Sequence, residues 1–188
     1  MRDGSETKER IERAALLLFV KRGIAETSIR QIAKAARVSL GAMYNHYKSK
    51  DELAEVLFAD LFHRIGAELE RLATANGSFT ARLKALVGHV FASLDRDEAA
   101  VTYLIRTRQE YTRRVRPGDG NPFLAFRALV LGGIETGAIA KQDPTLATAM
   151  IVGAINQVVE LRVAGRISLP PAALAETVSR GLLRLVGA

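Results

Sequence analysis

Cysteine and tryptophan are both absent from this 188-residue chain, which holds only 4 Tyr and 7 Phe. Without cysteine there is no disulfide, no Cys-ligated zinc site and no thiol nucleophile. Few aromatic residues and abundant alanine favour packed helices over a β-sandwich. Residues 1–13 are charged rather than patterned as a signal peptide, and no apolar run approaches the roughly 18 residues of a membrane helix. We therefore expect a soluble, cytoplasmic protein that does not enter a membrane.

The sequence motifs of common enzyme classes are also missing. The chain has no P-loop, no GxSxG and no Rossmann fingerprint. Its three histidines, His46, His63 and His89, show no metal-ligand spacing with carboxylates. The sequence therefore predicts no catalytic site, no metal site and no cofactor, and it argues against an enzyme.

The positive charge of the chain is concentrated at its start. Residues 1–50 contain 11 Lys and Arg against 5 Asp and Glu, whereas residues 51–188 contain 16 against 15, within a net charge of +7. A basic segment attached to a near-neutral body is typical of a nucleic-acid-binding protein. A merely solvated charged surface is the alternative explanation.

Three signals for the start of a helix follow one another within residues 27–53. They are two potential capping boxes and one potential N-cap: Ser28 with Gln31, Ser49 with Glu52, and Ser39. These signals predict a helix over 29–36, a second over 40–47 and a third that starts at Lys50. Two short helices joined by a tight turn form a helix-turn-helix, whose second helix enters the major groove of DNA. The pattern therefore predicts DNA binding.

Apolar residues recur with a helical period through the rest of the chain, so we expect an all-α fold. The predicted helices span 6–22, 29–36, 40–47, 50–73, 79–94, 97–115, 122–136, 144–164 and 171–186. The first three would form a helix-turn-helix DNA-binding domain over 1–50. The others would form a larger helical domain over 51–188 for ligand binding and dimerisation.

Over its whole length the chain resembles the tetracycline-repressor (TetR) family of transcriptional regulators. The resemblance lies mainly in SIRQIAKAARVSLGAMYNHYKSKDEL, residues 28–53, and more weakly in GAIAKQDPTLA, residues 137–147. It implies nine or ten helices and a homodimer that binds a palindromic operator in double-stranded DNA. It also implies a small-molecule effector, bound in the body, that changes the separation of the two heads. Repression is the usual outcome in this family.

Several head residues are candidates for DNA contact. Tyr44, His46 and Lys50 match positions that usually hold phosphates in the family, as a phenol, an imidazole and an ammonium can. Arg30 matches a position that can reach a guanine edge, with a phosphate contact as the alternative. The full predicted set is Thr27, Ser28, Arg30, Arg37, Ser39, Leu40, Gly41, Ala42, Tyr44, Asn45, His46, Lys48 and Lys50.

Two features of the head depart from the family pattern. Arg37 stands where the turn usually has Gly, and a left-handed backbone there costs a non-Gly residue on the order of 1 kcal/mol. Leu-Gly-Ala at 40–42 replaces polar residues of the second helix and cannot hydrogen-bond base edges. Polar reading would then fall to Ser39, Asn45 and Arg30. We expect an operator with notable A·T content, read partly by its shape.

The body offers two further candidate sites. An effector cavity among the fourth to seventh helices would be lined by Phe58, Phe62, His89, Phe91, Tyr103, Arg106, Glu110, Tyr111, Phe126 and Glu135. Surface or satisfied interior positions are the alternative for its polar members. A solvated basic helix face is our interpretation of Arg106, Arg108, Arg113, Arg114 and Arg116.

Small residues lie among large apolar ones in the last two predicted helices. This pattern allows close crossing, so the two helices could pair with their copies in a four-helix dimer interface. The candidates are Met150, Gly153, Ala154, Val158, Leu161, Val178, Gly181, Leu182 and Leu185. Ordinary monomer core is the alternative.

Two other functions compete with a ligand-responsive regulator. One is an enzyme or small-molecule-binding helical protein without specific operator recognition. The other is an architectural DNA-binding protein, which would not need a body as large as residues 51–188.

Overall fold

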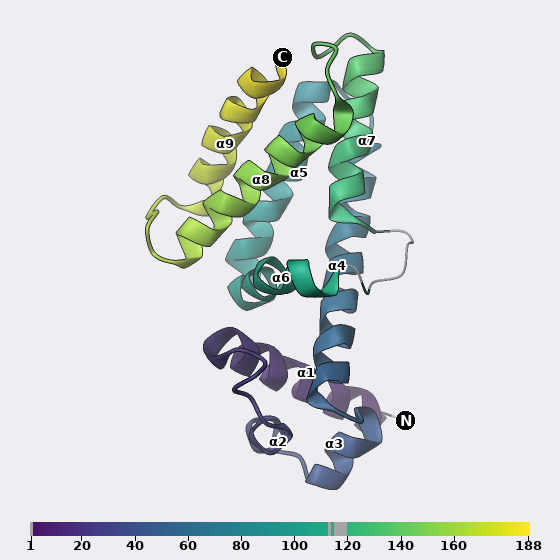
Figure 1. Ribbon diagram of the computed structural model, residues 1–188, viewed down its shortest axis with the longest axis vertical. Helices are drawn as coiled ribbons and strands as arrows, with labels where there is room; N and C mark the ends of the chain where they lie inside the picture. Colours follow the sequence, from purple (N-terminus) through teal and green to yellow (C-terminus); the bar gives the residue numbers. More distant parts are fainter. Residues whose placement is uncertain (1, 113, 115–119) are drawn as a thin grey trace. The chain divides into compact units, whose positions relative to one another are not determined.

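The computed structural model describes residues 2–112, 114 and 120–188, with side chains from Gly4 onward. Within these residues the chain is all-α, with nine helices and no strand (Figure 1). The helices are α1 Arg2–Arg22, α2 Ile29–Ala36, α3 Leu40–His46, α4 Lys50–Ala73, α5 Phe79–Arg96, α6 Glu98–Tyr111, α7 Pro122–Glu135, α8 Pro144–Val163 and α9 Pro171–Val186. The predicted all-α fold is confirmed, and most helix ends lie within two residues of the predicted ones.

The chain divides into two compact units. Unit 1 combines Met1–Leu61 with Thr102–Val115, and unit 2 combines Phe62–Val101 with Arg116–Ala188. The division falls inside α4 and inside α6, so each of these helices contributes residues to both units. Unit 1 is therefore larger than the segment 1–50 to which the sequence assigns DNA binding.

Unit 1 is built around the apolar face of α1. Ile11, Ala15 and Phe19 recur at helical spacing and are buried. They pack with apolar residues of the next helices, among which Ile32 and Met43 are inaccessible to solvent. Most of α6, from Thr102 onward, belongs to the same unit, where Tyr103 stacks against Phe19 with ring centroids 6.0 Å apart. This shared core fixes α2 and α3 as one body.

Unit 2 contains a second core. In this unit α5 packs against α9 and α7, and α7 packs against α8 (Figure 1). Leu83, Phe91 and Leu129 are fully buried there. Gly133 of α7 is required by this packing, because a Cβ atom at that position would lie 2.7 Å from the ring of Phe79. Gly66 has a similar role, since its Cβ would overlap the backbone of Gly120.

Helix α8 corrects one sequence-based expectation. Pro144–Val163 has an 18-residue window with a mean hydropathy of 1.4, so by length and composition it could cross a membrane. The expectation that no run approaches this length is therefore wrong. Only 28% of that window is buried inside the chain, which leaves much of its apolar surface uncovered. An exposed apolar surface of this kind is typical of an interaction site.

Candidate functional site

The start of α2 is fixed by its cap. The Ser28 hydroxyl accepts a hydrogen bond from the Gln31 amide at 3.3 Å, and the Gln31 side chain accepts one from the Ser28 amide at 2.8 Å. This is the predicted capping box, and it is confirmed. The helical spacing of the apolar residues buries Ile32, Ala33 and Ala36 on one face of α2, while Arg30 and Lys34 remain exposed.

Helix α3 is short and also begins at a side-chain cap. The Ser39 hydroxyl accepts a hydrogen bond from the Ala42 amide at 3.1 Å, as the sequence predicts. At the far end Tyr47 is buried, and its hydroxyl donates to the Glu12 carboxylate of α1. Burial, with the neighbouring Glu12 next, raises the pKa of Tyr47 far above its usual value, so this contact keeps its proton. Tyr47 therefore ties the end of α3 to α1.

The third predicted cap differs in detail. Ser49 accepts a hydrogen bond from the Glu52 amide at 3.0 Å, which matches one half of a capping box. The Glu52 carboxylate instead accepts from the Lys48 amide at 2.6 Å, one residue before the expected donor. The start of α4 at Lys50 is nevertheless as predicted.

The turn between α2 and α3 holds Arg37 in a left-handed conformation, with φ 56° and ψ 45°. Within the described residues it is the only non-Gly residue with positive φ. The Arg10 guanidinium from α1 stabilises this turn by donating to the Ala36 carbonyl at 3.2 and 2.7 Å and to the Arg37 carbonyl at 2.8 Å. The role of Arg10 could not be predicted from the sequence, because a contact across 26 residues leaves no periodic signal.

Lys50 and Thr27 both make contacts inside the head. The Lys50 ammonium donates to the carbonyls of Ile24 and Ala25, each at 2.8 Å. Thr27 is buried, and its hydroxyl donates to the Gly23 carbonyl at 2.8 Å. These side chains hold the loop between α1 and α2. Any phosphate contact of Thr27 would come from its backbone, and Lys50 has at most one ammonium proton left for a phosphate.

Other predicted DNA contacts lie at the surface of the head. Tyr44 is 57% exposed and Leu40 is 38% exposed, so α3 presents two large side chains to solvent. Also exposed are Ser28, Arg30, Arg37, Ser39, Gly41, Asn45 and Lys48, whereas Ala42 and His46 are half-buried. A Cβ atom at Gly41 would meet only the Ser39 hydroxyl, at 3.8 Å. The protein's own packing therefore does not require glycine at this position.

The segment that contains α2 and α3 has basic side chains but no acidic ones. From Thr27 to Lys50 the chain contains no Asp or Glu, but it contains Arg30, Lys34, Arg37, Lys48 and Lys50. Four of these five side chains are exposed. The carboxylates at the end of α3, Glu52 and Glu12, already accept hydrogen bonds from the Lys48 amide and the Tyr47 hydroxyl. An exposed set of Lys and Arg side chains around a short helix is suited to a polyanion with a groove.

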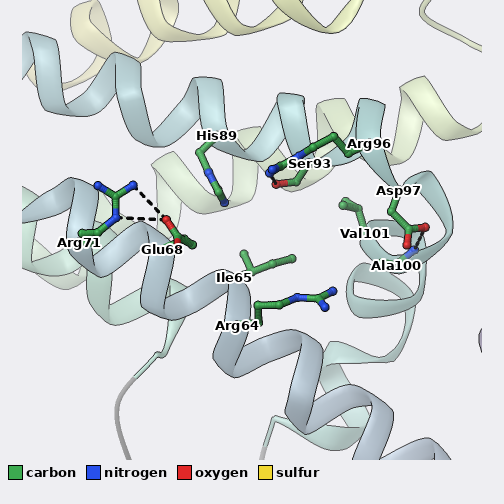
Figure 2. A pocket seen from close by; sticks show the side chains of 10 residues that line it. All are labelled: Arg64, Ile65, Glu68, Arg71, His89, Ser93, Arg96, Asp97, Ala100 and Val101. Atoms are coloured by element: carbon green, nitrogen blue, oxygen red, sulfur yellow. Dashed lines mark hydrogen bonds and ion pairs between the residues drawn. The ribbon is translucent and has the colours of Figure 1, made fainter. Parts of the chain in front are cut away.

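A pocket of about 550 Å³ lies within unit 2, between α4, α5 and the first residues of α6 (Figure 2). Its lining is strongly charged, with Arg64, Arg71 and Arg96 around His89. Arg71 donates to the Glu68 carboxylate at 3.0 and 3.2 Å. Burial, and then the nearby Arg96, lower the pKa of His89, so its imidazole is neutral at pH 7.

The residues predicted to line an effector cavity divide between the two units. In unit 1, Phe58 and Tyr111 pack with ring centroids 5.6 Å apart, and the Tyr103 hydroxyl donates to the Ala54 carbonyl at 2.8 Å. Arg106 donates to the Val20 carbonyl at 3.0 Å. Glu110 is exposed and lies 3.9 Å from Arg114. These contacts are structural ones.

In unit 2, Phe91 and Phe126 are buried, Phe62 is half-buried and Glu135 is exposed. Only His89 of the ten predicted residues lines the charged pocket. Arg64 and Arg96 were missed, because their positions on one pocket depend on how α4 and α5 are arranged. The basic face predicted on the sixth helix is not only solvated. Arg108 donates to the Ile105 carbonyl, and Arg114 forms an ion pair with Glu55. Arg113 and Arg116 lie outside the described residues.

The predicted dimer residues lie on α8 and α9. Met150, Gly153, Ala154, Leu161, Gly181 and Leu185 are exposed, and Val158 and Val178 are half-buried. Leu182 differs, since it is only 3% exposed and belongs to the core of its own chain. At Gly153 and Gly181 a Cβ atom would meet nothing within 4 Å.

The head has the features of a helix-turn-helix DNA-binding regulator: capped short helices, a fixed turn and a basic exposed surface. Residues 11–57 match the family described as bacterial regulatory proteins, tetR family. A curated relative, the HTH-type transcriptional regulator AcrR of Shigella flexneri, is 36% identical over 97 residues, which cover 51% of this chain and 45% of AcrR. The chain spans less than two thirds of the length of this relative.

Solved structures extend the likeness to the whole fold. A tetR-family regulatory protein from Rhodococcus RHA1 has a TM-score of 0.80 at 23% identity, covering 97% of both chains. The transcriptional regulator FadR from Bacillus subtilis, in complex with stearoyl-CoA, has a TM-score of 0.76 at 22% identity, covering 93% of this chain and 96% of FadR. Residues 11–57 are therefore a DNA-binding head of the TetR family of transcriptional regulators, and the fold of the whole chain is similar to that of a solved tetR-family structure. That family consists of transcription factors rather than enzymes.

Proposed function

We propose that this protein binds a palindromic operator as a homodimer and that a small-molecule effector in unit 2 weakens that binding, so that the protein acts as a repressor. The segment Thr27–Lys50 carries this proposal, because it contains a helix-turn-helix together with five Lys and Arg, four of them exposed, and no Asp or Glu. Phosphates would be held by Tyr44, Lys48, His46 and the remaining Lys50 proton. These contacts position the head but carry no sequence information directly.

Base reading would fall to residues along α3, to its N-cap Ser39 and to Arg30. Leu40 and Ala42 would contact thymine methyl groups, while Asn45 and Ser39 offer hydrogen bonds to base edges. The free space around Gly41 supports a close approach by the DNA. Such a set reads few bases by hydrogen bonds, which favours an operator rich in A·T.

The dimer is proposed from the surface of α8 and α9. Gly in the middle of a helix costs roughly 0.5–1 kcal/mol relative to Ala, yet nothing in the described chain needs the small size of Gly153 or Gly181. A second copy crossing closely at these positions would need it, and would cover Met150, Leu161 and Leu185. Two-fold symmetry would also match the two halves of a palindrome.

Coupling to an effector would run along the two helices that the units share. α4 contributes Arg64 to the pocket and begins at Lys50, which holds the loop before α2. α6 contributes Val101 to the pocket and then Arg106, which holds the end of α1. An effector that favours a different position of either helix would disfavour the DNA-bound arrangement.

The proposal is tested by selecting binding sites from a random duplex library, followed by titration of the enriched sequence. We expect a palindrome whose affinity falls steeply with salt concentration. Arg30→Ala should relax preference at one base pair in each half-site, by roughly 1–3 kcal/mol. Equal loss on operator and random DNA would make Arg30 a phosphate contact, and failure to enrich any sequence would contradict specific recognition.

A further inference from the structure

The charged pocket of unit 2 has a lining that selects its ligand. We propose that it binds an organic oxyanion, a carboxylate or phosphate on an apolar body, with Arg64 and Arg96 holding the anionic group. This inference rests on the proposed function for its regulatory meaning, because it names the ligand class of the effector site. Figure 2 shows the side chains of Arg64 and Arg96 on either side of Ile65 and Val101.

The arginines of the pocket are not equivalent. Arg71 is paired with Glu68, with which it forms two hydrogen bonds. Arg96 donates to the neutral hydroxyl of Ser93 at 3.0 Å. Among the described residues, no carboxylate lies within ion-pair distance of Arg64 or of Arg96. Two guanidinium groups on one pocket therefore have their charge free for a ligand.

The carboxylates of the lining do not cancel this charge. Glu68 is paired with Arg71, and Asp97 accepts a hydrogen bond from the Ala100 amide at 3.1 Å, at the start of α6. Both carboxylates thus already have partners. A planar guanidinium can donate two parallel hydrogen bonds to a carboxylate or phosphate, which is the geometry that an oxyanion needs.

The uncharged residues of the pocket indicate what kind of body the anionic group is attached to. Ile65, Ala100 and Val101 give the pocket an apolar wall. His89, neutral at pH 7, adds one donor and one acceptor without adding charge. The volume of about 550 Å³ is in the usual range for a small-molecule site. An anion with an aromatic or branched apolar body fits this combination better than an uncharged hydrocarbon or a long acyl chain alone.

The test uses calorimetric titration of the full-length protein with 2-naphthoate, 2-naphthyl phosphate and the neutral isostere 2-naphthamide. We expect at least one of the two anions to bind, and to bind at least tenfold more tightly than the amide. Arg64→Gln and Arg96→Gln should each weaken the anion by roughly 10- to 100-fold, as expected for loss of charged hydrogen bonds. Arg166→Gln, an exposed arginine outside the pocket, is the matched control and should leave binding unchanged.

Circular dichroism establishes that each variant is folded, so a loss of binding reflects the site. Binding of neither anion at millimolar concentration, equal binding of the amide, or unchanged anion binding in both arginine variants would overturn the inference. Operator affinity is measured separately without ligand. If the wild-type protein binds the anion but no operator, the proposed function is contradicted while the oxyanion site remains supported. The two failures are therefore distinguishable.

Discussion

Single residues of the head show how the chain combines stability with a surface for DNA. Arg37 adopts a left-handed backbone, although glycine would fit there without strain. Lys50 uses its ammonium inside the head rather than only at its surface. Both residues add positive charge beside α3. Their effect on stability and their proposed contribution to DNA binding can be separated by substitution.

Arg37→Gly should raise the free energy of unfolding by about 1 kcal/mol, because glycine adopts the left-handed conformation without steric cost. It should also weaken DNA binding and reduce the salt slope by about 1, if the guanidinium neutralises a phosphate. Arg37→Ala is the control, since it removes the same charge but keeps the strain. Urea unfolding measures the effect on stability, and DNA titration measures the effect on binding. If Arg37→Gly is no more stable than Arg37→Ala, the left-handed conformation of residue 37 is not strained.

Lys50→Met should lower the stability of the head by about 1.5–3 kcal/mol, because the carbonyls of Ile24 and Ala25 lose their charged donor. Lys48→Met removes an equal charge from an exposed side chain, and its effect on stability should stay within about 0.5 kcal/mol. Both should weaken binding to operator and random DNA alike. Thermal unfolding compares the pair, and equal stability of the two variants would show that the Lys50 contacts carry little energy.

Individual helices could be predicted well from sequence because their ends have local causes. Ser28, Ser39 and Asp143 accept hydrogen bonds from the first turns of α2, α3 and α8, and each signal lies within three residues of its partner. Contacts between helices have no such local signal in the sequence. Arg10 reaches the end of α2, and Arg64 and Arg96 meet around one pocket, only through packing that the sequence pattern does not encode. For that reason the caps and helix starts of the head were predicted, whereas the arginines of the pocket were not.

The hydrogen bonds from Arg10 of α1 to the end of α2 give a prediction about how these two helices are held together. Arg10→Lys keeps the charge but cannot fork between the Ala36 and Arg37 carbonyls, so it should destabilise the head by about 1 kcal/mol. Arg10→Gln should cost more. Because the turn sets the angle of α3, specific DNA binding should fall more than binding to random DNA. Parallel titrations of operator and random duplex test this, and a uniform loss would reduce Arg10 to a charge contribution.

At the scale of the whole molecule, the proposed dimer would cover α8 with a second copy and read both halves of a palindrome. Gly181→Arg places a long cation on the exposed face of α9, where a partner helix would approach. The variant should keep its helical circular dichroism, sediment as a monomer in detergent-free buffer and lose operator affinity. Ala85→Arg, on an exposed position of α5, is the control and should remain dimeric. A dimeric Gly181→Arg protein with wild-type affinity would place the interface elsewhere.

The central claim is that two heads, related by two-fold symmetry, occupy successive major grooves of one operator. Hydroxyl-radical footprinting of the selected palindrome with wild-type protein tests it most directly. We predict two protected regions related by the symmetry of the palindrome, with centres one helical turn, about 10–10.5 base pairs, or a whole multiple of it apart. A single protected region, or continuous protection without symmetry, would contradict the account.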